Sequence, residues 1–206
     1  MKWTEGGVCA PKGFQAAGLH MGVKTHNTEK KDVALIVSQQ MCTAAAVYTK
    51  NAVKAAHIYV DKKHLADCKC LAAVINSGNA NACAPCGEEN AIRVCAAAAK
   101  EIGCQAEDVV VASTGVIGQT LNIGAIEAGM PQLYQALSAD AAGSDGAAHA
   151  IMTTDTVKKE LAVETTVGGK TVHLGVCVRS LGMWFVCADM DGTLMYDMDL
   201  TGPIGL

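Results

Sequence analysis

The sequence has few aromatic residues, no cluster of basic residues and no long apolar run. Aromatics make up only 4% of the 206 residues, which argues against a binding surface of stacked rings. The formal net charge is −4, and phosphate binding needs clustered Lys and Arg, so we expect no nucleic-acid partner. No apolar stretch approaches the roughly 20 residues that span a bilayer, and the first residues lack the apolar core of a signal peptide. These absences predict a soluble, cytoplasmic protein with no membrane partner.

Small apolar residues and cysteine are abundant instead. Half of the residues are apolar, which is enough to bury a core without disulfides or metal. The pairs Cys83/Cys86 and Cys68/Cys70 raise the alternative of a zinc site, but the second pair has only one intervening residue. We predict that the ten cysteines pack mainly as small hydrophobic side chains, and that the protein uses no metal and no cofactor.

Hydrophobic spacing predicts an alternation of strands and helices. Short apolar or β-branched runs predict strands at 33–37, 46–49, 58–60, 71–75 and 109–112. Helical spacing predicts a helix over 88–102 that ends at Gly103, two short helices over 123–137 separated by Pro131, and a short helix over 147–152 after a loop at 139–144. Residues 161–167 and 172–176 alternate around Gly168-Gly169, which predicts a hairpin. Hairpins mixed with helices are typical of the α+β class.

Three segments combine polar and small residues where chemistry could take place. Residues 76–82 (Asn-Ser-Gly-Asn-Ala-Asn-Ala) suit close backbone approach to a ligand, or an ordinary Asx-turn with a helix cap. Residues 113–118 (Ser-Thr-Gly-Val-Ile-Gly) end a strand in a turn whose N–H groups and Thr hydroxyl could stabilise an oxyanion, or which is a plain β-turn. Residues 151–156 (Ile-Met-Thr-Thr-Asp-Thr) could contact a polar substrate or cap an element.

Taken together with residues 12–18, and in this order, these segments closely resemble the ornithine acetyltransferase (glutamate N-acetyltransferase, ArgJ) family of arginine biosynthesis. The resemblance runs from about residue 9 to residue 177 and includes the Gly168-Gly169 hairpin. It implies a layered αββα sandwich of the DmpA/ArgJ type, of which this chain carries the α-chain part. It also implies a precursor that cleaves itself before a Thr, and an α2β2 assembly.

The resemblance further implies acetyl transfer from N-acetylornithine, or in some members from acetyl-CoA, to glutamate through an acetyl-Thr intermediate. A Thr at a chain start is a suitable nucleophile because its own α-amine can act as the base. By position, Thr114 and Gly115 match the oxyanion-hole pair of the family, and Thr153 matches a substrate contact. The activity requires a β chain, which we expect another chain to supply.

The family pattern breaks near residue 178. Arg179 stands where the family has a substrate-binding Lys, and these two side chains are not interchangeable at a close site. Thr193, after Gly192, is the nearest candidate nucleophile, although it lies further from Arg179 than the family spacing. We therefore divide the chain into an α-chain domain (1–178) and a divergent tail (179–206), which a shifted reading frame or a split gene would explain.

Two alternatives to the acetyltransferase are considered. In the first alternative, the chain is a non-catalytic remnant or an interaction module. In the second, the tail resembles the first motif of haloacid-dehalogenase-type phosphatases, with Asp189 as nucleophile, Asp191 as acid/base and Mg²⁺ to neutralise charge. Few residues follow Asp191, whereas that family needs a long α/β core there, so we rank the phosphatase last.

Overall fold

The computed structural model describes residues 1–24, 26, 29–179, 183–189 and 193–197. Its strands are β1 (Lys2–Thr4), β2 (Phe14–Leu19), β3 (Val33–Val47), β4 (Lys69–Asn79), β5 (Val109–Val116), β6 (Lys159–Val167), β7 (Lys170–Arg179), β8 (Met183–Ala188) and β9 (Thr193–Asp197). Its α-helices are α1 (His57–His64), α2 (Gly87–Ile102), α3 (Ile123–Gln135) and α4 (Ala141–Ala150), with short 3₁₀ turns at η1 (Gly7–Cys9), η2 (Leu65–Asp67) and η3 (Ala106–Asp108).

The strands of the described residues form one hydrogen-bonded sheet in the order β1-β6-β7-β8-β9-β3-β4-β5, with β2 also paired to β3. β3 is the strand at which the sheet divides. Its first half pairs with β2 and its last residues pair with β9. A register shift between Val37 and Cys42 separates the two halves, because extra residues in one strand bend it locally. The β2–β5 part therefore continues into the β6–β9 part through one bent strand.

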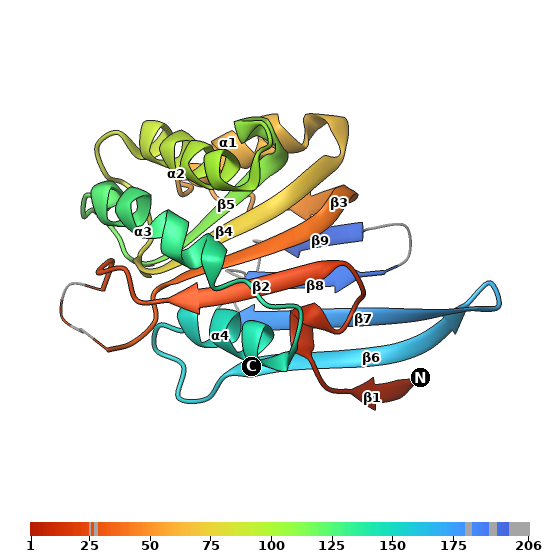
Figure 1. The fold of residues 1–206 in the computed structure, drawn as a ribbon. Coiled ribbons are helices and arrows are strands. Elements are labelled where there is room, and N and C mark those ends of the chain that lie inside the picture. Colours follow the sequence, from red (N-terminus) through yellow and green to blue (C-terminus); the bar gives the residue numbers. More distant parts are fainter. Residues whose placement is uncertain (25, 27–28, 180–182, 190–192, 198–206) are drawn as a thin grey trace, which may run out of the picture.

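Two apolar cores lie on opposite faces of β3. Val33, Leu35 and Val37 face the first core, whereas Ala34 and Ile36 face the second, as expected for alternating side chains. Helices α2 and α3 close the first core, and η1, α4, β7 and β8 close the second. Figure 1 shows α1, α2 and α3 on one side of β4 and β5, and α4 beside β2 on the other side. The predicted layered α+β sandwich is confirmed.

Helix α4 crosses β2 at a distance that requires small residues. An ideal Cβ added to Gly18 would lie 2.0 Å from the carbonyl oxygen of Gly146. The helix begins directly after Asp140, whose carboxylate accepts hydrogen bonds from the N–H groups of Ala142 and Gly143. The predicted loop over 139–144 is therefore wrong, since a cap and a closely packed helix take its place.

Other predicted elements have mixed outcomes. The hairpin is confirmed, with Gly168 and Gly169 at φ 57° and 80° as a type I′ turn requires. The helix over 88–102 and its stop at Gly103 are confirmed by α2. The predicted strand at 58–60 is wrong: it lies in α1, because three residues define no period and packing decided the outcome. Pro131 does not divide the next helix, since α3 runs through it.

Six of the ten cysteines are buried and line the cores: Cys9, Cys42, Cys70, Cys95, Cys177 and Cys187. Burial raises the pKa of the Cys177 thiol to about 12, as expected for an inert packing residue. Cys83 and Cys86 are exposed. Among the described residues, no group of three or more His, Cys, Asp and Glu side chains is placed to hold a metal ion. Within the same residues, no helix is long and apolar enough to cross a membrane.

Candidate functional site

The strands β4 and β5 run parallel and end side by side, which brings two of the polar segments together. Ser77 pairs with Thr114 and Gly78 pairs with Gly115. Thr114 is only 4% exposed, whereas Val116, two residues later, is 50% exposed. The chain therefore emerges from the core at the predicted oxyanion-hole pair.

Gly115 has a backbone conformation and a packing that no other residue fits. Its φ is 139°, and an ideal Cβ there would lie 2.3 Å from the carbonyl carbon of Gly78. The register shifts immediately afterwards, where Asn79 pairs with both Thr114 and Val116. Such a bulge redirects backbone groups out of the regular ladder, which is the geometry that an oxyanion hole made of N–H groups needs.

The Asn side chains of residues 76–82 hydrogen-bond to this segment and to neighbouring parts of the chain. Asn76 donates to the carbonyl of Asn79 at 2.8 Å and accepts from Ser113 Oγ at 2.6 Å. Asn79 donates to the carbonyls of residues 119 and 120, and Asn81 donates to the carbonyl of Gly87. Asn79 Oδ1 also accepts from the Asn81 N–H at 2.8 Å, which is an Asx-turn, whereas α2 begins after Cys86 without a side-chain cap. Together these bonds clamp the turn after Gly115.

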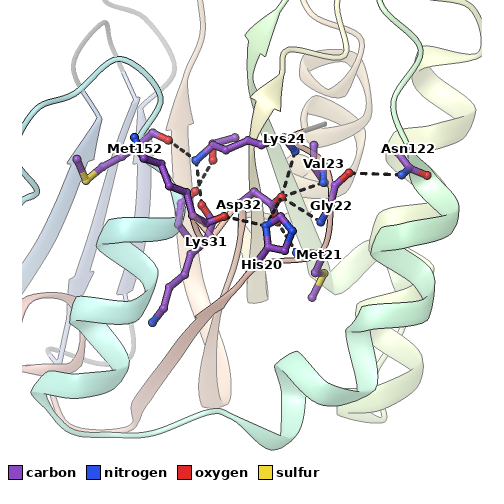
Figure 2. Close-up of polar contacts among 12 residues, drawn as sticks. His20, Met21, Gly22, Val23, Lys24, Lys31, Asp32, Asn122 and Met152 are labelled. Atoms are coloured by element: carbon purple, nitrogen blue, oxygen red, sulfur yellow. Dashed lines mark hydrogen bonds and ion pairs between the residues drawn. The ribbon is translucent and has the colours of Figure 1, made fainter. Parts of the chain in front are cut away.

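Lys24 extends this centre toward α4. The Lys24 side chain lies against Gly78, where an added Cβ would be 2.7 Å from Lys24 Cγ. Its Nζ donates to the carbonyl oxygens of Met152 at 2.8 Å and Lys31 at 2.9 Å (Figure 2). Burial lowers the pKa of the Lys24 ammonium, and the nearby Asp32 opposes this shift.

The loop that carries Lys24 is built around the carboxylate of Asp32. This side chain is fully buried and accepts hydrogen bonds from the four backbone N–H groups of residues 21–24, at 2.6–3.1 Å (Figure 2). The Nδ1 atom of His20 lies 3.3 Å from it. Four convergent N–H donors are a strong environment for a carboxylate. They fix the start of the Lys24 side chain relative to β3.

Thr153 and Arg179, the two predicted substrate contacts, touch each other. Arg179 donates from Nε and Nη2 to Thr153 Oγ1, at 3.0 and 2.8 Å. Asp155 accepts from the Thr153 N–H and forms an ion pair with Lys159 at 2.6 Å. Burial lowers the pKa of the Arg179 guanidinium, with Asp155 acting in the opposite direction. The structure thus links this pair, through Met152 and Lys24, to the Gly78–Gly115 turn.

A cavity of about 410 Å³ opens beside the middle of this line, at Lys24, Met152, Thr153 and Asp155. Its lining is Lys24, Lys30, Lys31 and His149, the carboxylates Glu29, Asp145 and Asp155, and Met152 and Thr153. The volume is in the range that holds a small ligand. Both signs of charge border it, which suits an amino-acid-like molecule. Lys24 and Asp32 were not singled out from the sequence.

The structure does not bring Thr193 to these residues. Thr193 begins β9 and pairs with Ala188, which pairs with Leu174 of β7. Leu174 is five positions before Arg179, or about 17 Å at roughly 3.3 Å per residue. The backbone of Thr193 therefore lies level with the middle of β7 and not with Arg179 at its end. The proposed scissile residue Gly192 lies outside the described residues, and the nucleophilic role of Thr193 stays a prediction.

Asp189, the nucleophile of the phosphatase alternative, is engaged within the sheet. Its Oδ1 accepts from the N–H of His173 at 2.8 Å, and its Oδ2 hydrogen-bonds the His173 Nδ1 at 2.8 Å. Its intended partner Asp191 lies outside the described residues. Asp189 thus faces His173 of β7 and not the cavity.

The fold and the site define an α+β protein with an amino-acid-sized polar cavity beside a glycine turn at two strand ends. Comparison with known proteins agrees with this class. Residues 15–200 match the ArgJ family model. The chain belongs to the ArgJ family.

Named relatives extend this result. The chain is 46% identical over 184 residues to the arginine biosynthesis bifunctional protein ArgJ of Gloeobacter violaceus, covering 88% of this chain and 44% of that one. It is 41% identical over 202 residues to the chloroplastic ArgJ of Physcomitrium patens, covering 97% and 39%. The chain thus spans less than half the length of these curated relatives.

Solved structures match over most of both chains. The crystal structure of ArgJ from Bacillus halodurans aligns with a TM-score of 0.80 and 38% identity, covering 85% of this chain and 90% of that chain. Ornithine acetyltransferase from Mycobacterium tuberculosis, solved in complex with ornithine, aligns with a TM-score of 0.77 and 35% identity, covering 85% and 92%.

Proposed function

We propose that this chain is the α portion of an acetyltransferase that moves acetyl from N-acetylornithine to glutamate. The observation that carries the proposal is the series of contacts from the Thr114-Gly115 turn through Gly78 and Lys24 to Thr153 and Arg179. Lys24 and Thr153 in this series line a cavity of amino-acid size. The names of the relatives, which are arginine-biosynthesis proteins and an ornithine acetyltransferase, support the same substrates.

Thr114 and Gly115 supply the oxyanion hole in this proposal. When a nucleophile attacks the acetyl carbonyl, the oxygen gains negative charge, and donors at a fixed strand end stabilise it without rearrangement. Loss of one such donor typically costs about 3 kcal/mol of transition-state stabilisation. The close packing of Gly115 on Gly78 supports this role, because it holds the turn in one conformation.

Thr153 and Arg179 contact the substrate. A guanidinium carries five N–H donors, and the two that reach Thr153 leave others to face a bound amino acid. Arg179 is partly buried, so a hydrogen bond from it is stronger than one made in water. We propose N-acetylornithine as the acetyl donor for this chain. Acetyl-CoA is an additional donor that the resemblance implies for some members of the family.

The nucleophile comes from a β portion supplied by another chain, in an α2β2 assembly. Chain lengths support a divided protein: the alignment spans about nine-tenths of each crystal chain but less than half of the curated sequences. That difference is what a precursor cut into two chains gives. A cytoplasmic location stays a prediction, since the Physcomitrium relative is chloroplastic by name.

The test is acetyl transfer from N-acetylornithine to glutamate, measured with this chain alone and with a co-expressed β portion of a relative. We expect transfer, with ping-pong kinetics, only in the complemented sample. Gly115→Ala keeps the backbone N–H but places a Cβ against the Gly78 carbonyl, so it should displace the donors of the turn and lower kcat by at least about 100-fold, as loss of an oxyanion-hole donor does. Gly118→Ala is the matched control, because it lies in the same turn at φ 78° but has open space around its Cβ position.

Absence of transfer in the complemented sample would favour the non-catalytic module. Equal loss in both glycine variants would remove the oxyanion-hole assignment, since backbone strain alone would explain it. Intact-mass measurement addresses the tail: a break between Gly192 and Thr193 would revive Thr193 as nucleophile, and an intact chain leaves it without a free amine.

A further inference from the structure

Lys24 occupies an unusual position for a cation at the edge of a protein. Its backbone is fixed by the Asp32 carboxylate, which accepts from the Lys24 N–H at 3.1 Å. Its side chain passes over Gly78 and its Nζ reaches the carbonyl of Met152, the residue before Thr153 (Figure 2). Both ends of this side chain are therefore held, so that the ammonium has one defined place in the cavity wall.

The ammonium retains hydrogen-bonding capacity there. A Lys side chain has three N–H donors, and the described residues provide two acceptors, the carbonyls of Met152 and Lys31. Both acceptors are neutral. The third donor is available to a bound molecule.

Two of the carboxylates that line the cavity, Asp145 and Asp155, are already paired with other cations. Asp155 forms an ion pair with Lys159 at 2.6 Å. Asp145 pairs with Lys158 and with His149. Asp32, behind Lys24, is satisfied by four N–H groups. The Lys24 ammonium thus borders the cavity with two neutral acceptors, the carbonyls of Lys31 and Met152, and with no carboxylate hydrogen-bonded to it among the described residues.

We propose that Lys24 binds the α-carboxylate of the substrate, and that Asp32 is the positioning residue that holds Lys24 in place. This inference rests on the proposed function in one respect: N-acetylornithine and glutamate share an α-carboxylate, so a ping-pong enzyme that binds both in turn needs one fixed cation for it. A charge-assisted hydrogen bond at a partly buried site is worth about 1.5–3 kcal/mol, which corresponds to at least about tenfold in affinity.

The test compares N-acetyl-L-ornithine with its α-carboxamide, by calorimetric titration of the full chain at pH 7. The parent protein should bind the carboxylate at least about tenfold more tightly than the amide. Lys24→Met should remove this preference, and Lys24→Arg should restore part of it. Asp32→Asn should reduce it while Lys24 is still present, an effect that a purely structural role would not produce in the ratio of the two affinities.

Lys30→Met is the matched control, since it removes the same charge from the lining of the same cavity on an exposed side chain. It should leave the preference unchanged. The proposal is overturned if the parent shows no preference, including the case of no binding, or if Lys24→Met retains it. A preference without acetyl transfer would overturn the proposed function alone, and transfer without a preference would overturn this inference alone.

Discussion

Asp32 and Asp61 are both completely buried, yet their surroundings are opposite. Asp32 accepts four backbone N–H groups from residues 21–24 and lies beside His20. Asp61, on α1, accepts one hydrogen bond, from the N–H of Val111 at 2.9 Å. Its second oxygen has no partner within the described part of the chain, and neither has either ring nitrogen of His57, one turn earlier.

The difference shows that burial alone does not give a polar group a role. Burial raises the pKa of Asp61 well above its usual value, against the effect of the Val111 N–H, and it lowers the pKa of His57 to about 3. The neutral forms of His57 and Asp61 are thus favoured in the folded protein, and both residues make the free energy of unfolding depend on pH. Asp32 is surrounded by donors, and it organises the loop that carries Lys24.

The largest expected effect is at Asp32. Asp32→Asn keeps one acceptor oxygen but places an NH₂ group against backbone donors, so we expect the free energy of unfolding to fall by about 2–4 kcal/mol. Asp61→Asn is the matched control: the same substitution at an equally buried site with a single N–H donor should change it by about 1 kcal/mol or less, or increase it. Urea unfolding at pH 7 measures both. Equal losses would show that partner number does not distinguish the two carboxyls.

Much of the framework around Asp32 could be predicted from the sequence. The strand at 33–37, helix α2 with its Gly103 stop and the Gly168-Gly169 hairpin all have strong local patterns, and they are where the sequence placed them. The turn at Thr114-Gly115 could be located as a strand end rich in small residues. Its neighbour Gly78 could not, because the contact depends on the parallel pairing of β4 with β5.

Asp32 and Lys24 were missed for a related reason. A lone Asp before an apolar strand has no local pattern that reveals four N–H donors eight to eleven residues earlier. The error at 58–60 has the same origin. Its short β-branched run suggested a strand, whereas the packing of α1 against β5 decided for a helix.

A second, smaller effect concerns His57. Below its ordinary pKa of 6.5 the unfolded chain binds a proton that the folded protein does not accept until about pH 3, so stability falls as the pH is lowered through this window. From pH 7 to pH 5 this loss is about 2 kcal/mol. His57→Leu should remove it. Asp61 acts with the opposite sign, because its raised pKa lowers stability as pH rises, but it is present in both proteins.

Unfolding curves of the parent and of His57→Leu between pH 5 and pH 7 therefore give the His57 contribution as a difference. Parallel pH dependences in the two proteins would mean that the imidazole gains a partner on protonation. His57 would then resemble Asp32 in having a hydrogen-bond partner inside the protein, although its ring nitrogens have none among the described residues.

The smallest expected effect separates partner number from burial. Arg93 of α2 and Glu127 of α3 form a bidentate pair, at 2.8 and 2.7 Å, in which the carboxylate has two charged donors but both side chains are partly exposed. We expect Arg93→Gln to leave the urea midpoint unchanged within error at high ionic strength, because water and salt replace what the pair provides. A loss comparable to that of Asp32→Asn would mean that the number of hydrogen bonds is decisive. An unchanged urea midpoint, the expected result, would instead show that the effect at Asp32 needs both burial and several hydrogen-bond donors. Those two conditions together hold Lys24 in the cavity wall.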